Sequence, residues 1–177
     1  MEQTAYGVVV HQGYADPSPY PEIKVQAVNR KYAAILMDDY AGPESELTAI
    51  TQYLFLQATA KGKGAEAGRT AVRIAITEMH HMEMLASVIV LLGGRPVFSG
   101  NQSAGKGFWS GRYPYYGTAL CDRLQAALNG EYQAIQNYEQ HIRMIEDPDV
   151  QAILKRIVLD ETLHVKILKG QISRFCR

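Results

Sequence analysis

Two short motifs of the same kind hold the residues of this chain that are best suited to chemistry. Each is a glutamate followed three positions later by a histidine: Glu78 with His81, and Glu161 with His164. Positions i and i+3 share one face of a helix, so each motif would present a carboxylate and an imidazole side by side. Iron and manganese accept this mixture of oxygen and nitrogen ligands, and zinc accepts it less specifically.

A single glutamate precedes each motif at nearly the same distance. Glu46 lies 32 positions before Glu78, and Glu131 lies 30 positions before Glu161. One Glu-x-x-His pair is common on helices, where it is usually a surface glutamate with a hydrogen-bonded core histidine. Two copies, each behind a matching glutamate, favour one shared metal site. The predicted ligands are Glu46, Glu78, His81, Glu131, Glu161 and His164.

The hydrophobic pattern predicts the helices that would position these ligands. Apolar residues recur at helical spacing around the ligands over residues 44–60, 65–92, 118–145 and 148–172. Glycine and proline mark the helix ends. Two helical hairpins joined by one long connection, residues 94–117, predict an all-α, ferritin-like four-helix bundle.

The N-terminal part of the chain differs from the rest. Residues 1–21 are rich in proline and tyrosine, which predicts an extended arm without a packed element of its own, lying on the domain or on a neighbouring subunit. Residues 22–40 predict a short first helix. We therefore expect an arm over residues 1–21 and a single bundle domain over residues 22–177.

Four glutamates on apolar stripes need compensation, because each buried carboxylate would cost several kcal/mol. No lysine or arginine is expected on these stripes near the glutamates, although protonation could also relieve the charge. Two divalent cations balance it, since four carboxylates carry −4, two neutral imidazoles carry 0 and two such ions carry +4. One glutamate from each of two helices and Glu-x-x-His from each of the others is the ligand pattern of di-iron and di-manganese bundles.

Two tyrosines extend the repeat. Tyr53 lies seven residues after Glu46, and Tyr138 lies seven after Glu131, so two helical turns keep each tyrosine on the stripe of its ligand. Either tyrosine could hydrogen-bond a ligand carboxylate, pass an electron, or be an ordinary core residue. We expect catalytic roles for Tyr53, Tyr138 and Glu161, with Glu161 able to carry a proton if it is not firmly bound to metal.

Three more residues accompany the motifs. Asp160 could hold a ligand histidine across the bundle, or it could be solvated. Thr77 occupies the equivalent place in the first half. His141 lies on an apolar stripe and is more often a hydrogen-bonded core histidine than a ligand.

Composition narrows the function classes. The 18 basic side chains equal the 18 acidic ones, so the total charge shows no footprint for nucleic acid or an anionic membrane. The two cysteines, Cys121 and Cys176, form no Cys-x-x-Cys pair, which excludes a rubredoxin-type iron site within this sequence. Their number and the absence of an evident signal peptide predict a reducing, cytoplasmic location.

The sequence resembles known families in both halves. Residues 31–57, which include Ser-Glu-Leu-Thr-Ala and a Tyr-Leu pair, resemble the start of manganese catalases and their spore-coat relatives. Residues 76–85 are similar to the second-helix motif of that family, Glu-x-x-His-x-Glu-Met. The second half, with Asp160-Glu161-x-x-His164, resembles rubrerythrins and bacterioferritins. The resemblance implies a dinuclear metal centre, and it allows a spore-associated location.

The resemblance implies redox chemistry on hydrogen peroxide or dioxygen at two manganese or iron ions. Peroxide disproportionation of the manganese-catalase type is the leading expectation, with the metals supplying both the Lewis acid and the electrons. A rubrerythrin-like peroxidase or ferroxidase, which would use an external electron donor, is the alternative. Iron storage, a structural coat protein and hydroxylation of an organic substrate also remain open. The aromatic arm and connection suggest a homo-oligomer, without nucleic-acid or membrane partners.

Overall fold

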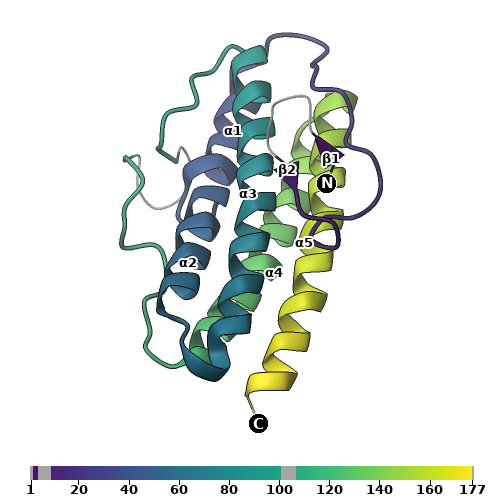
Figure 1. The fold of residues 1–177 in the computed structure, drawn as a ribbon. Helices are drawn as coiled ribbons and strands as arrows, with labels where there is room; N and C mark the ends of the chain where they lie inside the picture. The colour runs from purple at the N-terminus through teal and green to yellow at the C-terminus, as the bar shows by residue number, and fades with distance from the viewer. Residues whose placement is uncertain (1, 4–8, 101–106, 177) are drawn as a thin grey trace.

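A computed structural model describes residues 2–3, 9–100 and 107–176, and it is dominated by helices (Figure 1). Within these ranges the α-helices are α1 (Arg30–Ala41), α2 (Glu46–Thr59), α3 (Ala65–Leu91), α4 (Leu120–Met144) and α5 (Pro148–Phe175). The predicted all-α bundle is confirmed, and each bundle helix begins and ends within about three residues of its predicted limits.

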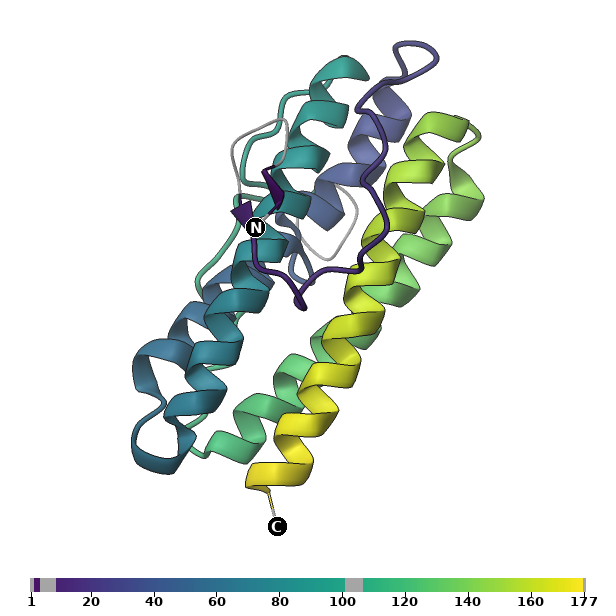
Figure 2. The ribbon, with the colours of Figure 1, turned by 45° about the vertical axis from the view of Figure 1, so that its right-hand side comes forward.

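Helices α2 to α5 form two antiparallel hairpins that face each other (Figure 2). A short 3-10 helix, η1 (Gly62–Gly64), joins α2 to α3, and a tight turn joins α4 to α5. Side-chain caps set the starts of two helices. Ser45 accepts a hydrogen bond from the amide of Thr48 before α2, and Asp147 accepts from the amides of Asp149 and Val150 before α5.

The first helix is shorter than the sequence predicted. Helix α1 begins at Arg30, because the side chain of Asn29 caps it by accepting hydrogen bonds from the amides of Lys31 and Tyr32. The eight residues before Arg30 form no helix and bend at residues 26–27. The Gln26 amide holds this segment to the turn between α4 and α5 by donating to Asp147 Oδ2, at 2.7 Å.

The N-terminal arm has a small element of its own, which the sequence did not predict. Strands β1 (Glu2–Gln3) and β2 (Val9–Val10) pair antiparallel. The chain then crosses α3 and α5 on the outside of the bundle (Figure 2). The arm therefore lies on its own domain, and the division of the chain at residue 21 stays a prediction.

The long connection between α3 and α4 packs along α2 in its described part. The Trp109 indole donates to Thr48 Oγ1 at 2.9 Å, and the Tyr115 amide donates to Gln52 at 2.8 Å. The ring of Tyr116 meets Phe55 edge to face, with ring centroids 5.0 Å apart. These contacts explain why the connection is rich in aromatic residues. Residues 101–106 lie outside the described ranges.

The core consists of two apolar clusters, one above and one below the middle of the bundle. The first gathers residues such as Leu85, Tyr138 and Ile157, and the second gathers residues such as Ile74 and Leu124. The five predicted ligands on α3, α4 and α5 fall between the two clusters along these helices, so apolar layers shield them on both sides. Helix α3 is long and apolar enough to cross a membrane by composition alone, but it is a core helix of this bundle.

A disulfide joins the start of α4 to the end of α5. Cys121 and Cys176 meet there with their Cα atoms 5.6 Å apart, because the two helices are antiparallel and of nearly equal length. This pairing was not predicted from the sequence. Disulfides are typical of oxidising compartments, so this pairing weighs against the predicted reducing location, which stays a prediction.

We expect reduction of this bridge to destabilise the protein. The bridge spans 55 positions, and a loop of that length constrains the unfolded chain by about 4 kcal/mol in the loop-entropy treatment. Denaturant unfolding of the metal-free protein with and without reductant would measure the difference. The Cys121→Ser/Cys176→Ser variant is the control, because reductant should not shift its midpoint. Equal midpoints for the oxidised and reduced native protein would contradict the expectation.

Candidate metal centre

The six predicted ligands come together in the middle of the bundle from all four of its helices. Glu46 is the first residue of α2, Glu131 lies in α4, and the two Glu-x-x-His motifs lie in α3 and α5. Each of the six side chains is at most 4% exposed. The hydrophobic stripe of each helix buries its ligand because the apolar residues one turn away on either side pack into the core.

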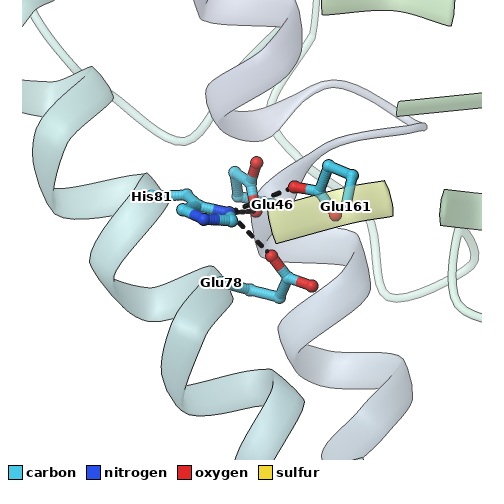
Figure 3. Close-up of side chains that lie close together, drawn as sticks. All are labelled: Glu46, Glu78, His81 and Glu161. Carbon is cyan, nitrogen blue, oxygen red and sulfur yellow. Dashed lines mark ion pairs between the residues drawn. The ribbon is translucent and has the colours of Figure 1, made fainter. Parts of the chain in front are cut away.

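The six residues form two overlapping groups whose ligand atoms lie within 4.8 Å of one another. Glu46 and His81 belong to the first group alone, and Glu131 and His164 to the second. Glu78 and Glu161 belong to both. Figure 3 shows the first group, in which three carboxylates from three helices point toward the His81 ring.

The two histidines have equivalent surroundings. His81 Nδ1 lies 2.9 Å from Glu78 Oε2 and 3.1 Å from Glu161 Oε1. His164 Nδ1 lies 3.0 Å from Glu78 Oε1 and 3.3 Å from Glu161 Oε2. Each imidazole therefore faces one oxygen of each central glutamate. The terminal glutamates complete the groups, with Glu46 Oε2 at 3.7 Å from His81 Nδ1 and Glu131 Oε2 at 3.5 Å from His164 Nδ1.

The outer ring nitrogens fix how each imidazole can act. His164 Nε2 lies 2.8 Å from the Tyr14 carbonyl oxygen, which can only accept, so Nε2 carries a hydrogen. His81 Nε2 lies 2.9 Å from Asp160 Oδ2. Hydrogen bonds from His81, Tyr20 and Arg156 outweigh burial and hold the pKa of Asp160 well below its usual range, so this carboxylate also accepts. In the neutral form each Nδ1 is left with a lone pair that faces the glutamates.

The two tyrosines each donate a hydrogen bond to a ligand glutamate of the opposite hairpin. The Tyr53 hydroxyl donates to Glu131 Oε1, and the Tyr138 hydroxyl donates to Glu46 Oε1. Each tyrosine thus holds the terminal glutamate of the opposite hairpin, although the sequence pairs it with the glutamate of its own helix. Both side chains are 2% exposed, so water does not compete for these bonds.

Several buried polar atoms at the centre lie close to one another but form no hydrogen bond of suitable geometry among the described residues. They are both carboxylate oxygens of Glu78, Glu161 Oε1 and His81 Nδ1. Such atoms are rare in folded proteins because each loses its hydration without a replacement. Carboxylate oxygens and an imidazole nitrogen that converge in this way are the donor set of a divalent transition metal ion. The residues present therefore fit the metal centre that the sequence predicted.

Comparison with known proteins agrees with this arrangement. The family model described as "Ferritin-like domain" matches residues 44–177, which is most of the chain. This chain belongs to the ferritin-like domain family. Among solved structures, a manganese catalase from Anabaena is 21% identical to this chain, with a TM-score of 0.80. The match covers 90% of this chain and 78% of the catalase chain. A search of curated protein sequences found no match.

Bacterioferritins share the same fold. The structure described as Rhodobacter capsulatus bacterioferritin with a metal-free dinuclear site and heme iron is 24% identical, with a TM-score of 0.69, and the match covers 86% of this chain and 89% of that one. Mycobacterium tuberculosis BfrA is 26% identical, with a TM-score of 0.64, over 81% of this chain and 83% of that one. The predicted resemblance to both groups is confirmed.

The ferritin-like centre opens to a small cavity on the α2–α4 side. Its volume is about 150 Å³. The cavity is lined by site residues, including Glu46, Glu131, Glu161, Tyr53 and Tyr138, and by Tyr113 from the long connection. Pockets for drug-sized ligands are larger, roughly 300–1,000 Å³. A few water molecules or a diatomic substrate fit this space.

The central residues have strongly coupled charges in the metal-free protein. Burial lowers the pKa values of His81 and His164, but the surrounding carboxylates outweigh burial and raise both pKa values well above the usual range. Burial raises the pKa of Glu78, yet the charge of His164 and the close contacts with His164 and His81 together outweigh it, and the net shift is downward. The pKa of Glu161 is also lowered, because hydrogen bonds to its neighbours outweigh burial and the Glu78 charge.

The terminal glutamates behave in the opposite way. Burial raises the pKa of Glu46 well above its usual range, and the Glu78 charge adds to the shift. Burial and the Glu161 charge raise the pKa of Glu131 to about 8. In the metal-free centre these directions favour protonated histidines and terminal glutamates beside ionised central glutamates, a combination in which the charges cancel.

Sequence reasoning missed part of the surroundings of the site. Arg156 is 5% exposed on α5 and pairs with Asp160 at 2.7 Å, and this buried arginine beside the site was not predicted. Its position one turn before Asp160 was the available signal. His141 belongs to neither ligand group. Its Nδ1 lies 2.7 Å from the carboxylate of buried Asp39, in agreement with the prediction of a hydrogen-bonded histidine.

Proposed function

We propose that this ferritin-like protein binds two manganese or iron ions and acts on hydrogen peroxide or dioxygen. The observation that supports the proposal best is the convergence of unpartnered carboxylate and imidazole atoms beside a small cavity. Peroxide disproportionation of the manganese-catalase type is the leading reaction. The Anabaena manganese catalase supports this choice by its fold alone, because its sequence identity is low.

In this proposal each ion would have one glutamate and one histidine of its own, and both ions would share two glutamates. Glu46 and His81 would hold the first ion, Glu131 and His164 would hold the second, and Glu78 and Glu161 would contribute to both. The bound ions would supply Lewis acidity and reversible one-electron chemistry. The two apolar clusters shield the centre from bulk water, and the bonds at Nε2 hold each imidazole with Nδ1 toward the glutamates that would hold the ions.

The residues that line the cavity have separate tasks. Glu161 reaches both ligand groups and the cavity, so its carboxylate can accept a proton from a substrate there and return it. The Tyr53 and Tyr138 hydroxyls orient the terminal carboxylates. The cavity volume of about 150 Å³ favours a small substrate over the organic substrate of a hydroxylase.

The second candidate is a peroxidase or ferroxidase that uses an external electron donor. The bacterioferritin folds favour it to a similar degree, because they match this chain at 24% and 26% identity. Iron storage is a different function and would require a closed shell of many subunits. The predicted homo-oligomer is a separate prediction, and neither enzymatic proposal depends on it. Native mass measurement separates a closed shell from a small oligomer.

The proposed reaction is tested by oxygen evolution from hydrogen peroxide with protein loaded separately with Mn(II) and Fe(II). We expect release of one O₂ for every two peroxide molecules with manganese. Glu78→Ala should abolish the release, whereas Glu139→Ala, an exposed glutamate on α4, should leave it unchanged. Peroxide consumption without oxygen would overturn the catalase reading in favour of the peroxidase. A lack of any reaction with peroxide or dioxygen would overturn both.

The cytoplasmic or spore-associated location is a separate proposal. The Cys121–Cys176 pair provides its test, because reducing surroundings keep such cysteines as thiols. Thiol labelling in cells before lysis should modify both cysteines if the location is reducing. Complete protection of both from the label would overturn the cytoplasmic proposal.

A further inference from the structure

A short segment of the N-terminal arm covers the outer side of both site histidines. This segment, residues 14–20, is called the strap below. It crosses from α3 to α5 on the face of the bundle opposite the cavity lined by α2 and α4 (Figure 2). The strap has no helix or strand of its own, so its position depends on contacts with the bundle.

One end of the strap contacts His164 directly. The Tyr14 carbonyl oxygen accepts from His164 Nε2 at 2.8 Å and from Thr77 Oγ1 at 3.0 Å. These two donors come from different hairpins, since Thr77 lies in α3 and His164 in α5. The carbonyl therefore fixes the His164 ring relative to α3, and Thr77 fixes the carbonyl.

The rest of the strap reaches His81 through Asp160. Besides His81, the Asp160 carboxylate accepts the Tyr20 hydroxyl at 2.6 Å and the Asp16 amide at 2.6 Å. Arg156 Nη1 is a further donor, at 2.7 Å. Two of the four donors belong to the strap, so the orientation of this fully buried carboxylate depends on whether the strap is seated.

Arg156 joins the strap to α5. Its Nε donates to the Ser18 carbonyl at 2.8 Å, and its Nη2 donates to the Asp16 carbonyl at 2.7 Å. The guanidinium also stacks on the Tyr20 ring, 3.9 Å from the ring centroid. With its third nitrogen on Asp160, this one side chain links the strap backbone to the group that holds His81.

We propose that the strap is a positioning segment for both metal-binding histidines, so that seating of the strap and binding of the two ions are thermodynamically coupled. The proposal rests on the metal centre proposed above but on neither reaction. Groups that hydrogen-bond metal-binding histidines typically contribute 10- to 100-fold to metal affinity. Coupling is reciprocal, so an ion that binds more tightly to the seated strap stabilises that seat by the same factor.

Two substitutions separate the two arms of this coupling. Tyr20→Phe removes the hydroxyl on Asp160 and keeps the ring on Arg156, so it should weaken the ion beside His81 by about 10-fold. Thr77→Val removes the second donor to the Tyr14 carbonyl and should weaken the ion beside His164 by a similar factor. Tyr116→Phe, at a half-exposed tyrosine on the far connection, is the control and should bind both ions normally.

Affinities come from Mn(II) titration in competition with a chelator, and the affected position comes from NMR of the Zn(II)-loaded protein. We expect the ring Nε2–H signal of His81 alone to move in Tyr20→Phe, and that of His164 alone in Thr77→Val. Normal Mn(II) binding by both variants would overturn the proposal. An equal loss at both positions, in step with lowered thermal stability, would also overturn it, because that result indicates a merely structural contact.

Hydrogen exchange gives a readout from the strap itself. The Asp16 amide is bonded to Asp160, so its exchange reports opening of the strap. Zn(II) loading should slow this exchange by about 10-fold for each coupled ion, and Tyr20→Phe should reduce the effect. Metal-independent exchange would overturn the proposal. A wild-type protein that binds no metal would overturn this proposal and the proposed function together, whereas coupling without any reaction with peroxide or dioxygen would overturn the function alone.

Discussion

Loading the metal-free protein with two equivalents of Mn(II) at pH 7 should release protons, up to four per chain. The two imidazoliums and the two carboxylic acids of the metal-free centre carry these protons, since the pKa values of His81, His164 and Glu46 are raised well above their usual ranges and that of Glu131 to about 8. Two doubly charged ions then replace four protons, and the buried centre remains neutral throughout.

The direction of the pH dependence follows from this exchange. Protons compete with the metals, so the apparent affinity should rise with pH, most steeply where all four protons are still present. Above about pH 8 Glu131 has lost its proton, and release should fall toward three per chain. The histidine protons leave from Nδ1, because Nε2 stays bonded to Asp160 in one ring and to the Tyr14 carbonyl in the other.

A pH-indicator titration in weak buffer measures the released protons directly. A matched titration of Glu131→Gln should release about one proton fewer, because its amide has no acidic proton to lose. Release of no protons at pH 7 would show that the six ligands are already in their metal-binding protonation states. In that case the raised pKa values would be wrong.

The second large effect concerns which glutamates are shared. Glu78 and Glu161 belong to both ligand groups, whereas Glu46 and Glu131 each belong to one. We therefore expect Glu78→Ala and Glu161→Ala to reduce the content from two ions to none at micromolar free metal. Glu46→Ala and Glu131→Ala should keep one ion, because each leaves one complete group of four ligands.

Metal analysis of the four variants after equilibrium dialysis measures this difference. Circular dichroism of each metal-free variant controls for folding, which the α-helical content reports. One ion retained in Glu78→Ala would contradict the sharing of this carboxylate, and so would two ions retained in Glu46→Ala. Tyr53→Phe is a further control, because it keeps all six ligands and should still bind two ions.

The ligands and their helices could be predicted from the sequence because both depend on local spacing. Glu78 and His81 share a helix face by the geometry of one turn, and the apolar stripe around them shows which face is buried. The second motif repeats the same information. The prediction of a bundle then follows from burying four such stripes against one another.

The surroundings of the ligands could not be predicted in the same way. Tyr14 contributes a backbone carbonyl, which any residue could supply, and it meets His164 from 150 positions away. The apolar pattern predicted that the first helix begins near residue 22, whereas the cap at Asn29 makes it begin at Arg30. The pattern alone does not show which of the two signals decides. Whether Tyr53 braces its own glutamate or that of the opposite hairpin depends on how the hairpins face each other, which no periodicity within one helix contains.

The Cys121–Cys176 bridge has a consequence for how the molecule comes apart. A peptide turn closes one end of the α4–α5 hairpin and the two sulfurs close the other, so these helices form a covalent ring. Glu131, Glu161 and His164 lie on that ring, whereas α2 is held to it without a covalent link, by packing, by the Tyr53 and Tyr138 bonds and by the bond from Arg123 to Thr59. We expect partial unfolding to begin at α2, so that the two ions leave in a set order and the ion beside Glu46 departs first.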